Sequence, residues 1–254
     1  MSIKIDSICK RYDTGLIALE NINLEIGNHE FVCILGPSGC GKSTLLNIIA
    51  GLDKPSNGMI IVDGNQISGP SNDRVMMFQG PSLFPWLTVI ENIKFGLKLK
   101  KIPKSEQDDI AIKFLKLINL EEFKEYNVYQ LSGGMQQRVT LARGLAIESP
   151  YILMDEPFSA LDKQTINILR EELELLWRHL ENTIIYVTHS VEEAIFFADR
   201  IVMLSANPGR IKKIFDIKLP RPRRIDNDEV VRLRSMILNE LRYEVELSEE
   251  KVIH

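Results

Sequence analysis

The sequence predicts an α/β fold built on a parallel sheet, and three features of the chain lead to this prediction. The apolar runs Phe31–Leu35, Tyr151–Met154 and Thr183–Thr188 are unbroken rather than alternating, which is typical of strands buried on both faces of a parallel sheet. Between the last two runs, apolar residues recur about every 3.6 positions from Ile166 onward, as in an amphipathic helix. Strand, helix and strand in this order imply right-handed parallel crossovers.

Three other parts of the chain have different patterns. The first thirty residues alternate partly between apolar and polar side chains, and Asn28 marks a turn, so we expect antiparallel β-structure there. From about Leu87 to Ile147 the helical patterns are broken at Pro103 and near Asn127, which predicts an inserted α-helical subdomain. After the Pro-rich segment Leu219–Arg224, the spacing of apolar residues predicts a final amphipathic helix.

The composition is that of a soluble globular protein. The 254 residues are 44% hydrophobic and 26% charged, and 31 basic against 35 acidic residues give a net charge of −4. This balance does not indicate a surface for nucleic acid, so we expect no nucleic-acid partner. No apolar run approaches the roughly 18–20 residues of a membrane span, and the first residues do not resemble a signal peptide. We therefore expect the chain to stay in the cytoplasm unless a partner holds it at a membrane.

The cysteines do not suggest a metal or redox site. Cys9, Cys33 and Cys40 are odd in number and form no CxxC pair. We interpret all three as reduced thiols, with Cys33 in the core and Cys40 in a loop.

The strongest local signal is a segment that fits GxxxxGK[ST] between a predicted strand and a predicted helix. Its glycines let several backbone N–H groups point at one phosphate, and the helix N-terminus adds partial positive charge. An ordinary glycine-rich turn is the alternative interpretation. The predicted phosphate-binding residues are Gly36, Pro37, Ser38, Gly39, Cys40, Gly41, Lys42, Ser43 and Thr44. Lys42 would reach the β- and γ-phosphates, and the Ser43 hydroxyl would bind Mg²⁺.

Polar residues also follow the two other buried runs. Asp155 and Glu156 come directly after Tyr151–Met154, at the edge of a parallel sheet where ligands bind. Asp155 would hold Mg²⁺ and Glu156 would orient or deprotonate water, although a helix cap is the alternative. His189 follows Thr183–Thr188 and could donate to a γ-phosphate. The capping pattern Ser190–Glu193 predicts that a helix begins directly after it.

A second Gly-rich turn precedes another predicted helix. Ser132, Gly133, Gly134, Met135 and Gln136 would form an anion site of the helix N-terminus kind, unless the turn is a simple helix cap. One chain with one phosphate loop hardly needs two phosphate sites for one nucleotide. The economical arrangement is a dimer in which this turn faces the partner's nucleotide.

These motifs together resemble those of ABC ATPases. LSGGMQQR resembles the signature motif of that family, GPSGCGKST its Walker A loop and YILMDE its Walker B strand. Ser159–Asp162 resembles the D-loop, Gln79 the Q-loop glutamine and His189 the switch histidine. Tyr12 lies where family members place the ring that stacks on adenine. The resemblance covers roughly residues 1–220, with the helical subdomain at about 87–147 and a C-terminal extension over 221–254.

The resemblance implies a specific site. ATP would lie between Gly36–Thr44 of one chain and the signature turn of a second, in a homodimer formed on ATP binding. Catalytic roles are implied for Glu156, His189 and Gln79, and metal ligation for Ser43, Gln79 and Asp155. The implied nucleotide contacts further include Tyr12, Ser132, Gly133, Gly134, Gln136 and Asp162.

Longer segments are similar to the nitrate, sulfonate and taurine group of bacterial importers. They include LFPWLTVIENI, SANPGRI and LPRPRR. This implies a peripheral ATPase subunit at the cytoplasmic face of the membrane, a separate permease docked near Gln79–Trp86, and indirectly an extracytoplasmic substrate-binding protein. The transported solute would be a small anion of the sulfonate, taurine or nitrate type, and a pyrimidine precursor also stays open. Gly80 departs from the group, whose members usually carry a larger polar or acidic residue there.

Three alternatives remain. A soluble ABC ATPase acting on DNA or ribosomes would usually have a long coiled-coil insertion or two cassettes, and neither is present. A nucleotide-gated scaffold would be favoured by loss of the glutamate or the histidine, and both are present. An exporter subunit stays open.

Overall fold

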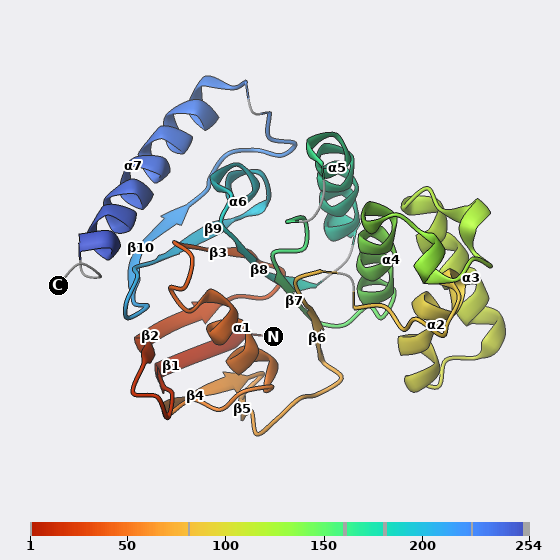
Figure 1. Cartoon of the computed structure of the whole chain (residues 1–254), viewed down its shortest axis with the longest axis horizontal. Helices are drawn as coiled ribbons and strands as arrows, with labels where there is room; N and C mark the ends of the chain where they lie inside the picture. The colour runs from red at the N-terminus through yellow and green to blue at the C-terminus, as the bar shows by residue number, and fades with distance from the viewer. Residues whose placement is uncertain (1, 81, 160–161, 180–181, 225, 251–254) are drawn as a thin grey trace. The chain divides into compact units, whose positions relative to one another are not determined.

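The computed structural model describes residues 2–80, 82–159, 162–179, 182–224 and 226–250. The chain forms two compact units. The first comprises Met1–Ser71 and Thr183–His254, and the second comprises Asn72–Asn182. Each unit contains both strands and helices (Figure 1).

The first unit contains an antiparallel sheet in the order β2-β1-β4-β5. Its strands are β1 (Ile3–Arg11), β2 (Ile17–Ile26), β4 (Asn57–Val62) and β5 (Asn65–Gln66). Ile3 lies opposite Ile26 on one side and Val62 on the other, and all three are buried. The predicted antiparallel β-structure is confirmed. The β1–β2 hairpin turns at Tyr12–Leu16, whereas the turn at Asn28 follows β2.

The same unit contains the strands of a largely parallel sheet. They are β3 (Phe31–Leu35), β8 (Thr183–Thr188), β9 (Arg200–Leu204) and β10 (Ile211–Asp216). β3 pairs in parallel with β8 and β9, and β10 is antiparallel to β9. Every residue of β3 and β8 is buried, as expected of strands covered on both faces. Two of the three apolar runs are thus confirmed as parallel strands.

Helices follow these strands. α1 (Lys42–Ala50) follows β3 and ends at Gly51, whose φ of 78° is the left-handed conformation that glycine adopts without a Cβ penalty. The predicted end of this helix is confirmed. α6 (Val191–Phe197) follows β8, and α7 (Asp228–Glu250) forms the C-terminal helix.

Two arginines fix the Pro-rich segment that precedes α7. Arg223 is only 5% exposed, and its guanidinium donates to five backbone carbonyls, those of Ile195, Phe196, Ala198, Ile217 and Leu219. Arg221 donates to the Phe197 carbonyl and to the Asp199 carboxylate, at 2.5 and 2.6 Å. The last carbonyls of a helix lack partners within it. The two arginines therefore complete the C-terminal end of α6.

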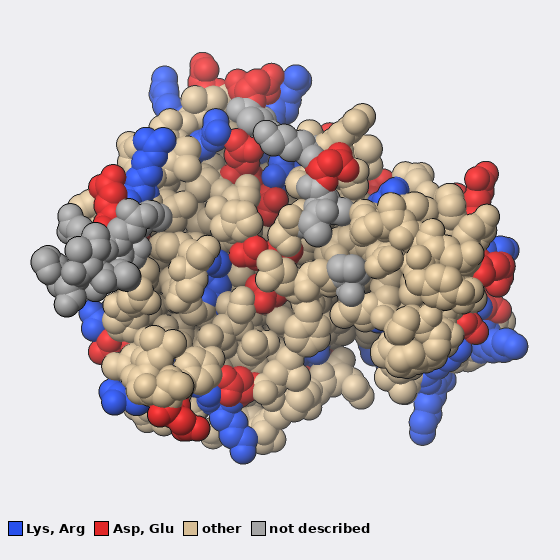
Figure 2. All heavy atoms as spheres, viewed as in Figure 1, with Lys and Arg blue, Asp and Glu red and all other residues tan. Residues whose placement is uncertain are grey.

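α7 lies along β10 and α6 (Figure 1). The predicted amphipathic helix is confirmed, because Val230 and Ile237 are buried while Val231 and Met236 are exposed. Ion pairs join its polar residues to the neighbouring elements, between Arg234 and Glu192, Lys212 and Glu240, and Lys213 and Glu240. On this part of the surface, basic and acidic side chains are interspersed (Figure 2).

The second unit contains a parallel pair of strands, β6 (Arg74–Met77) and β7 (Tyr151–Asp155). Its helices are α2 (Val89–Leu99), α3 (Lys104–Leu117), η1 (Glu121–Phe123), η2 (Val128–Gln130), α4 (Gly133–Leu145) and α5 (Lys163–His179). α2, α3 and α4 come between the two strands in the sequence, and α2 packs against both other helices. All of β7 is buried, so the third apolar run is also a confirmed strand, and it extends to Asp155.

Candidate nucleotide-binding site

The Gly-rich loop of the first unit curls tightly between β3 and α1. Gly39 and Gly41 have φ values of 77° and 92°, in the left-handed region that other residues rarely adopt. A Cβ on Gly41 would lie 2.7 Å from Leu19 Cδ2 and 2.8 Å from the Ala18 carbonyl oxygen. The loop therefore needs glycine at position 41 for both conformation and space.

Lys42 folds back into this loop. Its side chain is buried, and Nζ donates to the carbonyls of Gly36 and Pro37 at 2.9 and 2.8 Å. The ammonium charge thus lies inside the loop, next to the N-terminus of α1. Burial raises the pKa of the neighbouring Cys40 thiol, although the Lys42 charge opposes this, so Cys40 is a neutral thiol at pH 7.

The N-terminus of α1 has no side-chain cap. Gly41 occupies the cap position, and the first turn carries no acidic residue. The caps of α2, α4 and α6 differ, because Thr88, Ser132 and Ser190 each accept a backbone N–H there. An uncapped helix start beside a buried lysine fits an anionic ligand such as a phosphate.

Tyr12 lies next to the phosphate loop although it is distant from it in the sequence. Its hydroxyl is 3.2 Å from Thr44 Oγ1, and its ring is partly exposed. Lys10 Nζ lies 5.0 Å from the ring centroid. The ring borders a cavity of about 530 Å³ lined by residues of β1, β2 and their turn, which is within the size range of small-molecule sites.

His189 lies at the same edge of the sheet as the loop. Leu35 pairs with Thr188 across the parallel strands, so Gly36 and His189 are each one residue beyond a paired position. His189 is exposed. As predicted, Ser190 caps α6 by accepting the Glu193 N–H at 3.3 Å. The Glu193 carboxylate does not complete a capping box, however. It accepts from the hydroxyls of Tyr186 and Thr188 instead.

In the second unit, the acidic pair lies at the C-terminal end of β7. Asp155 is its buried last residue, and Glu156 is half-buried with a φ of 45°. A left-handed conformation in a non-glycine residue is uncommon and often marks a functional site. Gln79 is exposed, two residues beyond Met77, which pairs with Met154. Register thus brings Gln79 and Asp155 to one sheet edge.

The signature turn caps α4. Ser132 Oγ accepts the Met135 N–H at 3.3 Å, and Gln136 Nε2 donates to the Leu131 carbonyl at 3.2 Å. Ser132 and Gly133 are exposed. One turn further on, the buried Gln137 donates to the carbonyl of Pro157, directly after Glu156. Gln137 has no predicted role, although its i+4 spacing from Gly133 places both on one helix face.

Asp162 caps α5. Its Oδ1 accepts the N–H groups of Gln164 and Thr165, both at 3.0 Å, and its Oδ2 accepts the Thr165 hydroxyl at 2.7 Å. The hydrogen bonds from Thr165 lower the pKa of this carboxyl group below its usual value. Ala160 and Leu161 of the predicted D-loop lie outside the described residues.

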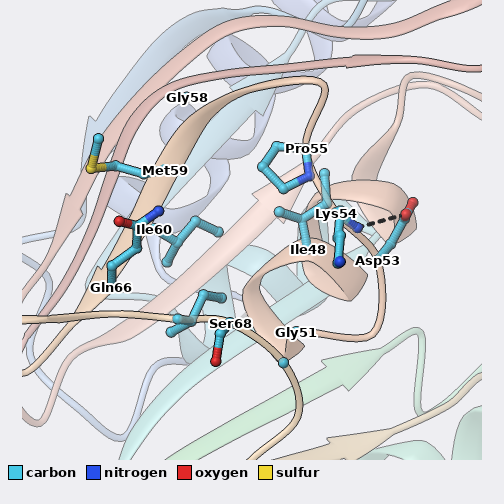
Figure 3. Close-up of a pocket in the computed structure, with 12 residues that line it drawn as sticks. Ile48, Gly51, Asp53, Lys54, Pro55, Gly58, Met59, Ile60, Gln66 and Ser68 are labelled. Carbon is cyan, nitrogen blue, oxygen red and sulfur yellow. Dashed lines mark hydrogen bonds between the residues drawn. The ribbon is translucent and has the colours of Figure 1, made fainter.

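A separate cavity of about 470 Å³ lies at the C-terminal end of α1, away from the phosphate loop. Figure 3 shows Asp53, Lys54 and Pro55 on one side of it and Gln66 and Ser68 on the other. It is lined by no residue with a predicted role in nucleotide binding.

Similarity to known proteins identifies the family of this chain. A family model described as "ABC transporter" matches residues 19–159. The nitrate import ATP-binding protein of Synechocystis sp. is 50% identical over 206 residues, 81% of this chain and 77% of that protein. The aliphatic sulfonates import ATP-binding protein of Bacillus cereus is 42% identical over 246 residues, 96% of this chain and 97% of that protein.

A solved structure gives the same answer. It is a dimeric, post-hydrolysis state of an ATP-binding cassette bound to ADP and Pi, with a TM-score of 0.76 and 35% identity, and the match covers 86% of this chain and 100% of that one. The chain therefore belongs to the ABC transporter family. The resemblance to nitrate and sulfonate import proteins and the predicted P-loop α/β fold are both confirmed. Within the described residues, every helix is too short or too polar to cross a membrane.

Proposed function

We propose that this chain binds and hydrolyses ATP to power the uptake of a small anion through a separate membrane permease. The observation that carries the proposal is the uncapped start of α1, where Gly41 and the buried Lys42 leave a positively polarised turn. The similarity of the chain to import ATP-binding proteins supports the direction of transport.

ATP would bind with its adenine on Tyr12 and its phosphates on Gly36–Thr44. The Tyr12–Thr44 contact supports this, because it joins the two ends of such a ligand's site. On ATP binding, Lys42 would give up its hydrogen bonds to the loop carbonyls and contact the β- and γ-phosphates instead. Ser132, Gly133, Gly134, Gln136 and Asp162 would complete the site from a second chain, in a homodimer formed on ATP binding. The dimeric state of the similar ATP-binding cassette supports this arrangement.

A magnesium ion would bind at three of the predicted positions. Ser43, Gln79 and Asp155 supply a hydroxyl, an amide and a buried carboxylate, and such oxygen ligands suit Mg²⁺, which also binds phosphate oxygens. In the part of the chain that the structure describes, no three His, Cys, Asp or Glu side chains cluster. The ion would neutralise phosphate charge.

For hydrolysis, Glu156 would accept a proton from the attacking water or orient it, and His189 would donate a hydrogen bond to the γ-phosphate. Gln79 would sense the same phosphate at its own sheet edge. All three roles need fixed geometry more than covalent chemistry, since phosphoryl transfer depends mainly on positioning and electrostatics. The left-handed backbone at Glu156 supports a fixed position.

We place the ATPase domain at residues 1–220, its helical subdomain at about 87–147 and the C-terminal extension at 221–254. The chain would sit peripherally at the cytoplasmic face of the membrane. Residues Gln79–Trp86 would contact the permease, and Pro81 in this segment lies outside the described residues. An extracytoplasmic binding protein would deliver a sulfonate, taurine or nitrate-type solute.

The test is reconstitution of the chain with its permease and binding protein in vesicles with ATP inside. We expect ATP-dependent uptake of radiolabelled sulfonate, taurine or nitrate, and no uptake when Lys42→Ala replaces the chain. ATP-dependent movement of these anions in the opposite direction would contradict the importer assignment. ATP hydrolysis with no transport of any of them would contradict the solute class.

A further inference from the structure

Two hydrogen-bonded residues flank His189. Thr188 Oγ1 donates to the Glu193 carboxylate at 2.7 Å and accepts the Ser190 N–H at 3.0 Å. Ser190 Oγ accepts the Glu193 N–H at 3.3 Å. The backbone on both sides of His189 is therefore fixed by side chains of the same β8–α6 turn.

Glu193 is turned away from its usual place for a capping residue. In a capping box it would accept the N–H of Ser190, but here the Thr188 hydroxyl accepts that N–H. The Glu193 carboxylate is buried, and one oxygen, Oε2, accepts from both Tyr186 and Thr188. A buried carboxylate is costly unless it is hydrogen-bonded, and bonds to an ionised acceptor are the strong ones.

We propose that Thr188 and Glu193 are positioning residues for His189. The hydrogen bond between them sets the direction in which His189 leaves the sheet. This rests on the proposed contact of His189 with the γ-phosphate. Tyr186 shares the Glu193 oxygen but lies three residues before His189, and its side chain is fully buried in the β8 core. Loss of the Tyr186 hydroxyl should remove one of the two donors to the Glu193 carboxylate. Thr188, the residue next to His189, would keep its own hydrogen bond to that carboxylate.

The primary test compares three variants in the purified full-length chain. Thr188→Val removes the hydroxyl but keeps the branched shape, Thr188→Ser restores the hydroxyl, and Tyr186→Phe removes the other donor to Glu193. We expect Thr188→Val to lower kcat for ATP hydrolysis about tenfold or more, as a displaced catalytic contact would. KM for ATP should change less than about twofold. Thr188→Ser and Tyr186→Phe should keep near-normal kcat. Equal loss of kcat in Thr188→Val and Tyr186→Phe would overturn the proposal, because it would indicate a general structural effect.

A His189→Ala background separates the positioning role from the role of His189 itself. If His189→Ala hydrolyses ATP normally, the proposed γ-phosphate contact is wrong and the positioning role falls with it. If His189→Ala is impaired, adding Thr188→Val should lower kcat no further. If Thr188→Val lowers kcat in the His189→Ala background as much as it does in the natural chain, Thr188 does not act through His189. The proposed role of His189 itself would then still stand.

A second variant covers failure of Thr188→Val to fold. Glu193→Gln keeps the length and one acceptor oxygen but loses the charge, so its hydrogen bond to Thr188 should weaken. We expect a loss of kcat of about two- to fivefold, absent in the His189→Ala background. An unchanged kcat in folded Glu193→Gln would count against the proposal.

Discussion

The Tyr12 hydroxyl lies 3.2 Å from the Thr44 hydroxyl, so the residue after β1 contacts the first turn of α1. A ring in this place can stack on a base whose phosphates lie on the Gly-rich loop. Stacking of this kind is worth about 1–3 kcal/mol.

We predict that Tyr12→Ala weakens ATP binding about tenfold or more, the range that this stacking energy gives. Tyr12→Phe is the matched control, because it keeps the ring and removes only the contact with Thr44. It should bind ATP within about threefold of the natural chain, since one exposed hydrogen bond contributes little. Isothermal titration calorimetry measures both. Natural affinity in Tyr12→Ala would remove Tyr12 from the site.

Gly39 and Gly41 of the loop share a left-handed backbone but differ in the space around them. Both Gly39 and Gly41 are left-handed, but a Cβ would meet nothing within 4 Å at Gly39 and would clash at Gly41. Gly39→Ala should lower the free energy of unfolding by about 1–2 kcal/mol, the cost of the conformation. Gly41→Ala should lower the free energy of unfolding by about 1–3 kcal/mol more than Gly39→Ala, because its Cβ also overpacks the loop. Urea unfolding of the nucleotide-free chain tests this, and equal losses would contradict the loop geometry.

The proposed permease surface is best tested at Trp86. Phe84 packs against Phe95, with ring centroids 4.3 Å apart, and is half-buried, whereas Trp86 is 72% exposed. A charge at Phe84 would therefore damage the second unit, while Trp86→Glu should leave basal hydrolysis intact. Exposed aromatic residues are common partner contacts.

We expect Trp86→Glu to abolish most transport in reconstituted vesicles while ATP hydrolysis by the isolated chain stays normal. Leu99→Glu is the control, since Leu99 is 71% exposed at the other end of α2. Normal transport by Trp86→Glu would remove this residue from the interface.

The C-terminal extension should be needed for stability. Arg223 is buried and donates to five carbonyls, whereas the neighbouring Arg224 is exposed. Arg223→Met should lower the free energy of unfolding by about 3 kcal/mol, because buried acceptors lose their donor. Arg224→Met should change it by less than about 0.5 kcal/mol. Similar denaturation midpoints of Arg223→Met and Arg224→Met would contradict this prediction. Full stability of a chain that ends at residue 220 would contradict it too.

The sequence allowed the local features to be predicted, and the structure explains why other features could not be. The three buried strands and the Gly51 helix end depend on nearby residues, which the chain displays directly. Glu193 looked like a capping residue, but the hydroxyls of Tyr186 and Thr188 on β8 hold its carboxylate inside the protein. Arg223 lies in a Pro-rich segment that suggested only an extended break. Its burial depends on hydrogen bonds to backbone carbonyls at the end of α6, which no local pattern reveals.

Glu156→Gln tests the central claim most directly, because it keeps size and hydrogen bonding but removes the negative charge. We expect kcat to fall by about 10²-fold or more, the range for a general base, while ATP still binds. Gel filtration with ATP and Mg²⁺ should show a dimer that returns to monomer when ATP is removed. Adding Ser132→Arg should prevent the dimer, because a large cation would occupy the turn that faces the partner's nucleotide. A normal rate of hydrolysis in Glu156→Gln, or a monomer at saturating ATP, would contradict the account.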